Sequence, residues 1–110
     1  MAEKINVPSD PRAAYFLESL KECDDGMIIV LNRRLAPRDE KGKREVSYAC
    51  RAILPEEGIF KYLGEGESLQ EVEAQKRESR WVPLIAGSIS ADVCRFAADR
   101  FARKLEIRSY

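Results

Sequence analysis

The sequence contains no histidine. Histidine is the commonest general base and the commonest metal ligand, and it activates the serine and cysteine nucleophiles of many hydrolases. Its absence therefore excludes the most frequent catalytic arrangements. Carboxylates, lysine, tyrosine and cysteine remain as candidates for chemistry, and none of them clusters in a recognisable motif. The sequence favours a role without catalysis and predicts neither a metal site nor a cofactor.

Cysteine pairs and long apolar runs are also missing. Cys23, Cys50 and Cys94 lie far apart and form no C-x-x-C pair, which argues against a zinc knuckle or a redox dithiol. They are expected to be reduced, buried thiols. The first residues lack the apolar stretch of a signal peptide, and no apolar run approaches the roughly 18 residues that cross a membrane. These observations predict a cytoplasmic protein that does not engage a membrane.

The overall charge is balanced but unevenly distributed. The chain has 110 residues, 45% hydrophobic and 35% charged, with 19 basic and 19 acidic side chains. This composition predicts one globular domain over residues 1–110. Residues 33–51 carry a net charge of +4, and residues 56–78 carry a net charge of −4. The neutral total therefore conceals a dipolar chain.

Three helices are expected from capping signals and apolar spacing. The first follows Ser9-Asp10-Pro11 and has an apolar stripe made of Ala13, Phe16, Leu17 and Leu20. The second begins at the capping box of Ser68 and Glu71 and runs to about residue 79. The third and strongest follows residues 87–90, and its inward stripe consists of Ile89, Val93, Cys94, Phe96, Ala97 and Phe101.

Four strands are expected between and after these helices. Residues 27–31 are continuously apolar, which is typical of a central strand buried on both faces. Residues 44–54 alternate, and the polar stretch before them predicts a long β-hairpin. Residues 81–86 contain Pro83, which predicts an edge strand, and residues 104–108 alternate as a final strand. Residues 55–63 fit a short helix and a strand equally well, and residues 64–66 read as a turn.

Together these elements predict an α+β fold. The expected architecture is a two-layer α/β sandwich with helices on one face of a mixed, mostly antiparallel sheet of about four strands.

The first candidate binding surface is the basic hairpin. Lysine and arginine side chains along a hairpin suit a phosphate backbone, because each contact releases counterions. The residues of this candidate polyanion site are Arg33, Arg34, Arg38, Lys41, Lys43 and Arg44. The expected partner is nucleic acid or an acidic protein surface, including the acidic segment of a second copy in a homodimer. The competing interpretation is a solvated loop whose charges keep sheet edges apart.

The second candidate is the segment of Gly87, Ser88 and Ser90, where a strand ends and a helix begins. Unpaired backbone N–H groups and the helix dipole attract anions at such a place, although serine there is also an ordinary N-cap. The hypotheses in order of preference are a small binding or adaptor module that contacts a polyanion, a protein-interaction or self-assembly domain, and a phosphometabolite-binding protein.

Overall fold

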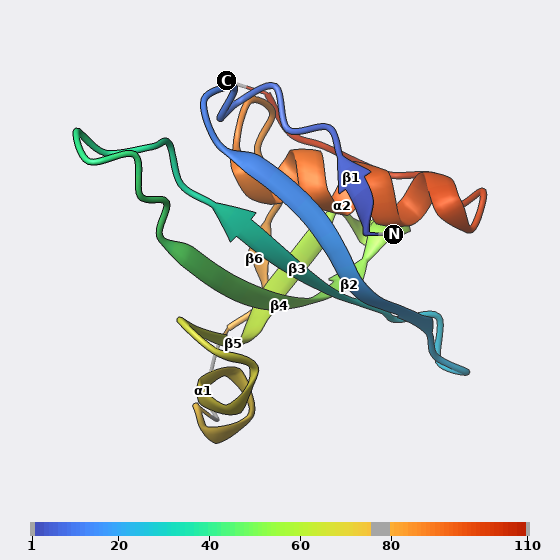
Figure 1. Ribbon diagram of the computed structural model, residues 1–110. Helices are drawn as coiled ribbons and strands as arrows, with labels where there is room; N and C mark the ends of the chain where they lie inside the picture. The colour runs from blue at the N-terminus through green and yellow to red at the C-terminus, as the bar shows by residue number, and fades with distance from the viewer. Residues whose placement is uncertain (1, 76–79, 110) are drawn as a thin grey trace.

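The structure, a computed structural model, describes residues 2–75 and 80–109. Its centre is a six-stranded antiparallel sheet in which each strand lies beside the next one in the chain (Figure 1). The strands are β1 (Glu3–Ile5), β2 (Ala14–Glu22), β3 (Ile28–Leu35), β4 (Val46–Leu54), β5 (Ile59–Gly66) and β6 (Val82–Pro83). The remaining elements are the 3₁₀ turn η1 (Pro55–Glu57) and the helices α1 (Leu69–Ala74) and α2 (Ile89–Arg100).

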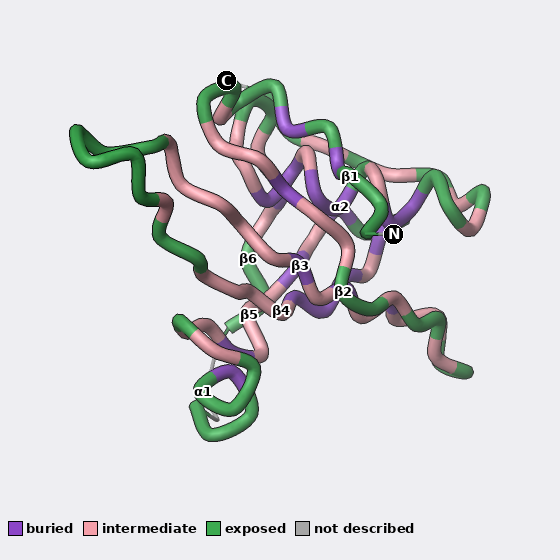
Figure 2. Tube along the Cα trace, in the orientation of Figure 1, coloured by how far each residue is buried: buried purple, intermediate pink, exposed green. Residues whose placement is uncertain are grey.

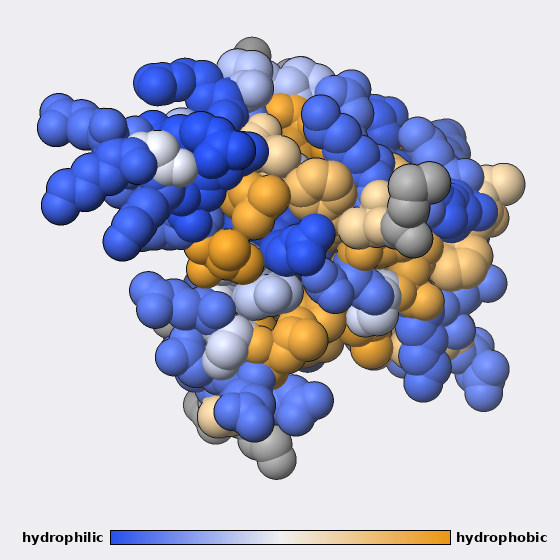
Figure 3. All heavy atoms as spheres, viewed as in Figure 1, coloured by the Kyte–Doolittle hydropathy of each residue, from blue (hydrophilic) through white to orange (hydrophobic). Residues whose placement is uncertain are grey.

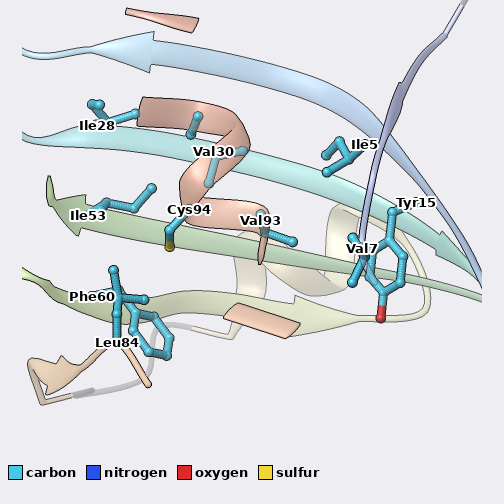
Figure 4. Close-up of a cluster of buried hydrophobic side chains, with 11 residues drawn as sticks. Ile5, Val7, Tyr15, Ile28, Val30, Ile53, Phe60, Leu84, Val93 and Cys94 are labelled. Carbon is cyan, nitrogen blue, oxygen red and sulfur yellow. The ribbon is translucent and has the colours of Figure 1, made fainter. Parts of the chain in front are cut away.

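The sheet curves around α2, which covers one of its faces (Figure 1). We call this face the helix face and the opposite one the open face. The core lies between the helix face and α2, and it is built from apolar side chains that alternate along the strands (Figure 4). Its fully buried members include Ile28, Val30, Ile53, Val93, Cys94 and Ala97. Figure 2 shows the burial concentrated at this layer, while the tip of the β3–β4 hairpin is exposed.

The helix α1 packs on the open face at the end of β5. In the pairing of β4 with β5, Gly64 lies opposite Cys50. Cys50 precedes Arg51, whose side chain is on the helix face, so Cys50 and Gly64 are on the open face. A side chain at Gly64 would collide with the backbone carbonyl of Val72, so the close approach of α1 requires glycine. The two helices therefore lie on opposite faces, which corrects the prediction that helices cover one face only.

The capping signals at residues 68 and 88 are confirmed. The Ser68 hydroxyl accepts a hydrogen bond from the backbone N–H of Glu71, and Ser88 caps α2 in the same way by accepting from Ala91. The Glu71 carboxylate accepts from the N–H of Glu67 rather than from that of Ser68, so the capping box is only half formed. The predicted helix over residues 69–79 is α1 as far as Ala74, and residues 76–79 lie outside the described part of the chain.

The predicted first helix is wrong, because residues 14–22 form β2. The apolar spacing that suggested a helix comes from a β-bulge between Leu17 and Ser19, which shifts the alternation by one residue. Pairing with β1 and β3 on both sides outweighs the local helix signal. Asp10, the expected helix cap, binds side chains on β2 and β3 instead.

The other strand predictions hold in part. The hairpin of β3 and β4, the edge position of β6 and the strong final helix are confirmed, and residues 55–63 contain both alternatives as η1 and the start of β5. The residues expected to form a turn at 64–66 continue β5. Residues 104–108 form no ladder, and only a bridge between Ile85 and Arg108 is present. The sheet has six strands rather than about four, because β1 and β2 were not expected and the region of β5 was left open between helix and strand.

Neither helix of the described residues has the length and apolar character needed to cross a membrane.

Candidate anion-binding site

A cavity of about 380 Å³ opens on the helix face, beyond the N-terminal end of α2. Strands β2 to β5 and the first residue of α2, Ile89, form its walls. The α2 helix covers the half of the helix face that holds Val30 and Ile53, and the cavity occupies the other half. Its volume falls in the range of small-molecule sites, about 300–1,000 Å³. We call it the Arg51 cavity after the central residue of its wall.

Arg51 is the most unusual residue of this wall. It is only 4% exposed, although it carries a full positive charge. Its Nε donates to the Ser90 hydroxyl at 3.0 Å, one terminal nitrogen donates to the Asn32 side-chain carbonyl at 2.7 Å, and the other approaches the Tyr62 hydroxyl at 3.4 Å. The guanidinium carbon also lies 4.9 Å from the centre of the Tyr62 ring. The arginine is thus held in one orientation by strands β3 and β5 and by helix α2.

All the partners of Arg51 are neutral. Among the described residues it takes part in no ion pair, since its hydrogen bonds go to an amide and two hydroxyl groups. A buried cation without a countercharge costs several kcal/mol relative to water, and hydrogen bonds to neutral groups recover part of that cost. The electrostatics of this wall therefore favour an anion in the cavity.

The donors left on this wall suit an anion. A guanidinium has five N–H groups, and the three hydrogen bonds of Arg51 leave one N–H on each terminal nitrogen. Asn32, which is 2% exposed, acts as an acceptor towards Arg51, so that its amide group keeps two N–H donors. Arg51 and Asn32 thus hold up to four donors beside the same cavity.

A second, paired cation lies further along the wall. The Arg34 Nε donates to Asp10 at 3.0 Å and to the Tyr15 hydroxyl at 3.1 Å, and Tyr15 donates to Asp10 at 2.8 Å. The hydrogen bond from Tyr15 holds the pKa of Asp10 below its usual value, and Arg34 acts in the same direction. Burial raises the pKa of Tyr15 to about 12, with the hydrogen bond to Asp10 adding to the effect. Tyr15 and Arg34 of this trio line the cavity, and the charge of Arg34 is matched by Asp10.

The predicted helix-start site is only partly in the cavity. Ser88 uses its hydroxyl internally, because it donates to the Ile85 carbonyl at 2.7 Å and accepts from the Ala91 N–H at 3.1 Å. Gly87 lies in the exposed turn with φ +84°. Ser90 faces Arg51 and Tyr62, and its hydroxyl lies 3.1 Å from the Tyr62 hydroxyl. Of the three residues, the structure places Ser90 in the network around the cavity.

The predicted basic surface is divided by the pleat of the sheet. Arg33 and Arg34 are consecutive in β3 and therefore point to opposite faces. Arg34 lines the Arg51 cavity, whereas Arg33 lies over the Phe16 ring on the open face, with its guanidinium carbon 5.0 Å from the ring centre.

The other four residues of that surface lie in the hairpin connection. Arg38 donates to the Gly42 carbonyl at 2.9 Å, and Arg44 donates to the Ala36 carbonyl at 2.8 Å, so both brace the loop. Lys41 and Lys43 are exposed at the tip. Residues 36–45 hold four basic and three acidic side chains, a net charge of +1, so the strong positive charge counted along the sequence is not concentrated there.

The open face carries apolar side chains across the middle of the sheet (Figure 3). They are half-buried residues of β2, β3 and β4, among them Phe16, Ile29, Leu31, Leu35 and Cys50. The prediction that β3 is buried on both faces is therefore half right: Ile28 and Val30 are buried on the helix face, and Ile29 and Leu31 on the open face are partly covered.

Sequence reasoning missed Arg51 and Asn32 as site residues. Arg51 was counted only as one charge of the basic segment, and Asn32 carries no motif. The available signal was the alternation in β4, which places the side chain of Arg51 on one face of the strand and those of Cys50 and Ala52 on the other. That pattern shows that the two faces differ, but only the position of α2 shows that the arginine side is the covered one. Comparison with protein families, curated proteins and solved structures finds no match to this chain.

Proposed function

We propose that the protein binds a small anionic molecule in the Arg51 cavity. The observation that carries the proposal is the buried Arg51 guanidinium, whose partners among the described residues are all neutral and which lines a cavity of ligand size. An anion there would supply the countercharge that the described partners of Arg51 do not provide.

The location of α2 supports the same conclusion. Its N-terminal residue Ile89 forms part of the wall, and the N-terminus of a helix carries a partial positive charge. An anion in the cavity would therefore be attracted both by the positive end of α2 and by Arg51. The proposal thus develops the ligand-binding alternative from the sequence, with the site moved from the turn at residues 87–90 to the space between Ser90 and the sheet.

Chemical-shift mapping with two simple anions tests this function. The ¹⁵N-labelled protein is titrated with sodium benzoate and with inorganic phosphate at constant ionic strength. At least one anion is expected to shift the amide signals of residues 49–51 and 89–91, and the Arg51→Gln variant should lose those shifts. Arg38→Gln is the matched control, because it removes an arginine of the hairpin tip. Shifts that persist in the Arg51→Gln protein, or the absence of any shift at the cavity with both anions, would refute the proposal.

Polyanion binding through the β3–β4 hairpin stays a prediction, and the same spectra test it. Addition of a mixed-sequence oligonucleotide at low salt would shift signals of residues 38–44, and added salt would reverse the effect. The Arg38→Gln variant would then be the weakened one and Arg51→Gln the control. Such an outcome would move the function from the cavity to the hairpin.

A further inference from the structure

The charges around the Arg51 cavity limit the charge of its ligand. On the basis of the function proposed above, we infer that the ligand is a monocarboxylate with an apolar body of about the size of an aromatic ring. Of the two arginines in the wall, Arg34 is paired with Asp10. One cation of the described wall, Arg51, therefore remains for the ligand, and a dianion such as a phosphate monoester would bring a second negative charge that this one cation does not balance.

The geometry of the donors favours a planar acid group. The two unused N–H groups of Arg51 sit on its two terminal nitrogens, and a guanidinium can present one N–H from each of these nitrogens as a fork that matches the two oxygens of a carboxylate. Asn32 offers amide N–H groups on the neighbouring strand, in the register position of Ala49. These donors suffice for the two oxygens of a carboxylate.

The rest of the wall is suited to an apolar body. Tyr15 and Tyr62 contribute aromatic side chains from β2 and β5, and Ala49 and Ile89 contribute aliphatic ones. The hydroxyl groups of both tyrosines are engaged, Tyr15 with Asp10 and Tyr62 with Ser90. An inorganic ion would leave most of the cavity unfilled, whereas a ring or a short aliphatic chain would bury apolar surface against these residues.

The test compares probes that differ in one property at a time. Benzoate, acetate, phenyl phosphate and benzyl alcohol are titrated separately, and dissociation constants are taken from the amide shifts of residues 49–51. Benzoate should bind at least about tenfold more tightly than each of the others, because acetate lacks the body, phenyl phosphate carries a second charge and benzyl alcohol lacks the charge. Arg51→Gln should weaken benzoate binding by about tenfold or more.

Two further variants keep the result interpretable. Arg33→Gln is the matched control, because Arg33 lies on the open face of the same sheet, and it should leave the dissociation constant unchanged. Ala49→Leu fills the cavity without removing a charge, and it should abolish benzoate binding even if the Arg51 variant fails to fold.

The outcomes separate the inference from the proposed function. Tighter binding of phenyl phosphate than of benzoate, lost with Ala49→Leu, would overturn the monocarboxylate and keep the cavity as an anion site. Acetate binding as tightly as benzoate would overturn the apolar body. If none of the probes shifts the cavity signals, the monocarboxylate and the anion site both fall.

Discussion

Replacement of Arg51 by methionine distinguishes a binding residue from a structural one. Methionine preserves most of the length of the side chain and removes the charge and its three hydrogen bonds. Burial of the cation costs several kcal/mol. Against this, the three hydrogen bonds contribute about 1 kcal/mol each, and the contact with the Tyr62 ring contributes about 1–2 kcal/mol. These terms nearly cancel, so Arg51 adds little to the free energy of unfolding.

The variant introduces one new cost. The Asn32 carbonyl loses its donor, which costs about 1–3 kcal/mol in a dry interior and less where water reaches it. Asn32 lines the open cavity, so the lower end applies. We therefore expect Arg51→Met to change the free energy of unfolding by less than about 1.5 kcal/mol. Ile53→Ala, which alters a fully buried residue on the same face of β4, should cost about 2–5 kcal/mol.

Urea unfolding followed by far-ultraviolet circular dichroism measures both variants, with the slope m checked for each. The second part of the assay adds benzoate at about ten times its dissociation constant, which should stabilise the wild-type protein by about 1.4 kcal/mol and leave Arg51→Met unchanged. A loss of more than about 3 kcal/mol in Arg51→Met without ligand, at unchanged m, would refute the reasoning. It would show that the arginine is retained for the fold and that its interactions with neutral partners outweigh the cost of its burial.

Three further predictions concern the fold and its ionisable groups. Gly64→Ala should lower the free energy of unfolding by about 1–3 kcal/mol in urea titrations, because the new methyl group meets the Val72 carbonyl; an unchanged midpoint would mean that α1 does not pack there. Asp10→Asn should cost about 1 kcal/mol at pH 7, given the partial exposure of the carboxylate. Since the pKa of Asp10 is lowered in the fold by the bond from Tyr15, this stabilisation is complete above the ordinary carboxyl pKa and is lost as the pH falls through the folded value. Thermal unfolding of both proteins from pH 7 to pH 2 should show their difference shrinking, and a constant difference would contradict the assignment. Burial raises the pKa of Cys94 to about 12, so iodoacetamide at pH 8 should modify it only after unfolding; rapid modification of the native protein, detected by peptide mass spectrometry, would show that the core opens.

Local chemistry predicted several elements correctly. Ser68 and Ser88 are N-caps because a hydroxyl before a helix satisfies a free N–H whatever the rest of the fold does. The apolar run at 27–31 and the alternation at 44–54 each indicated a strand, and together they predicted the central hairpin of β3 and β4. Pro83 predicted an edge strand because proline lacks the donor that an inner strand needs.

The wrong predictions concern segments whose structure depends on contacts between residues that are distant in sequence. Residues 13–20 carry a pattern that a helix and a bulged strand share, and pairing with β1 and β3 decided between them. The two glycines expected in a turn, Gly64 and Gly66, serve the approach of α1, which sequence spacing cannot show.

The site depends on tertiary structure almost entirely. The sequence by itself determined the alternation that sets Arg51 and Cys50 on opposite faces of β4. It did not determine which face α2 would cover, because both faces of β4 contain small or apolar residues. Packing of α2 against Val30 and Ile53 buried the arginine side and brought Ser90 to the guanidinium. Pairing of β4 with β3 and β5 placed Asn32 and Tyr62 beside it. A side chain that reads as one charge of a basic hairpin thus became a buried cation with neutral partners, because burial and the absence of a countercharge are properties of the assembled layers.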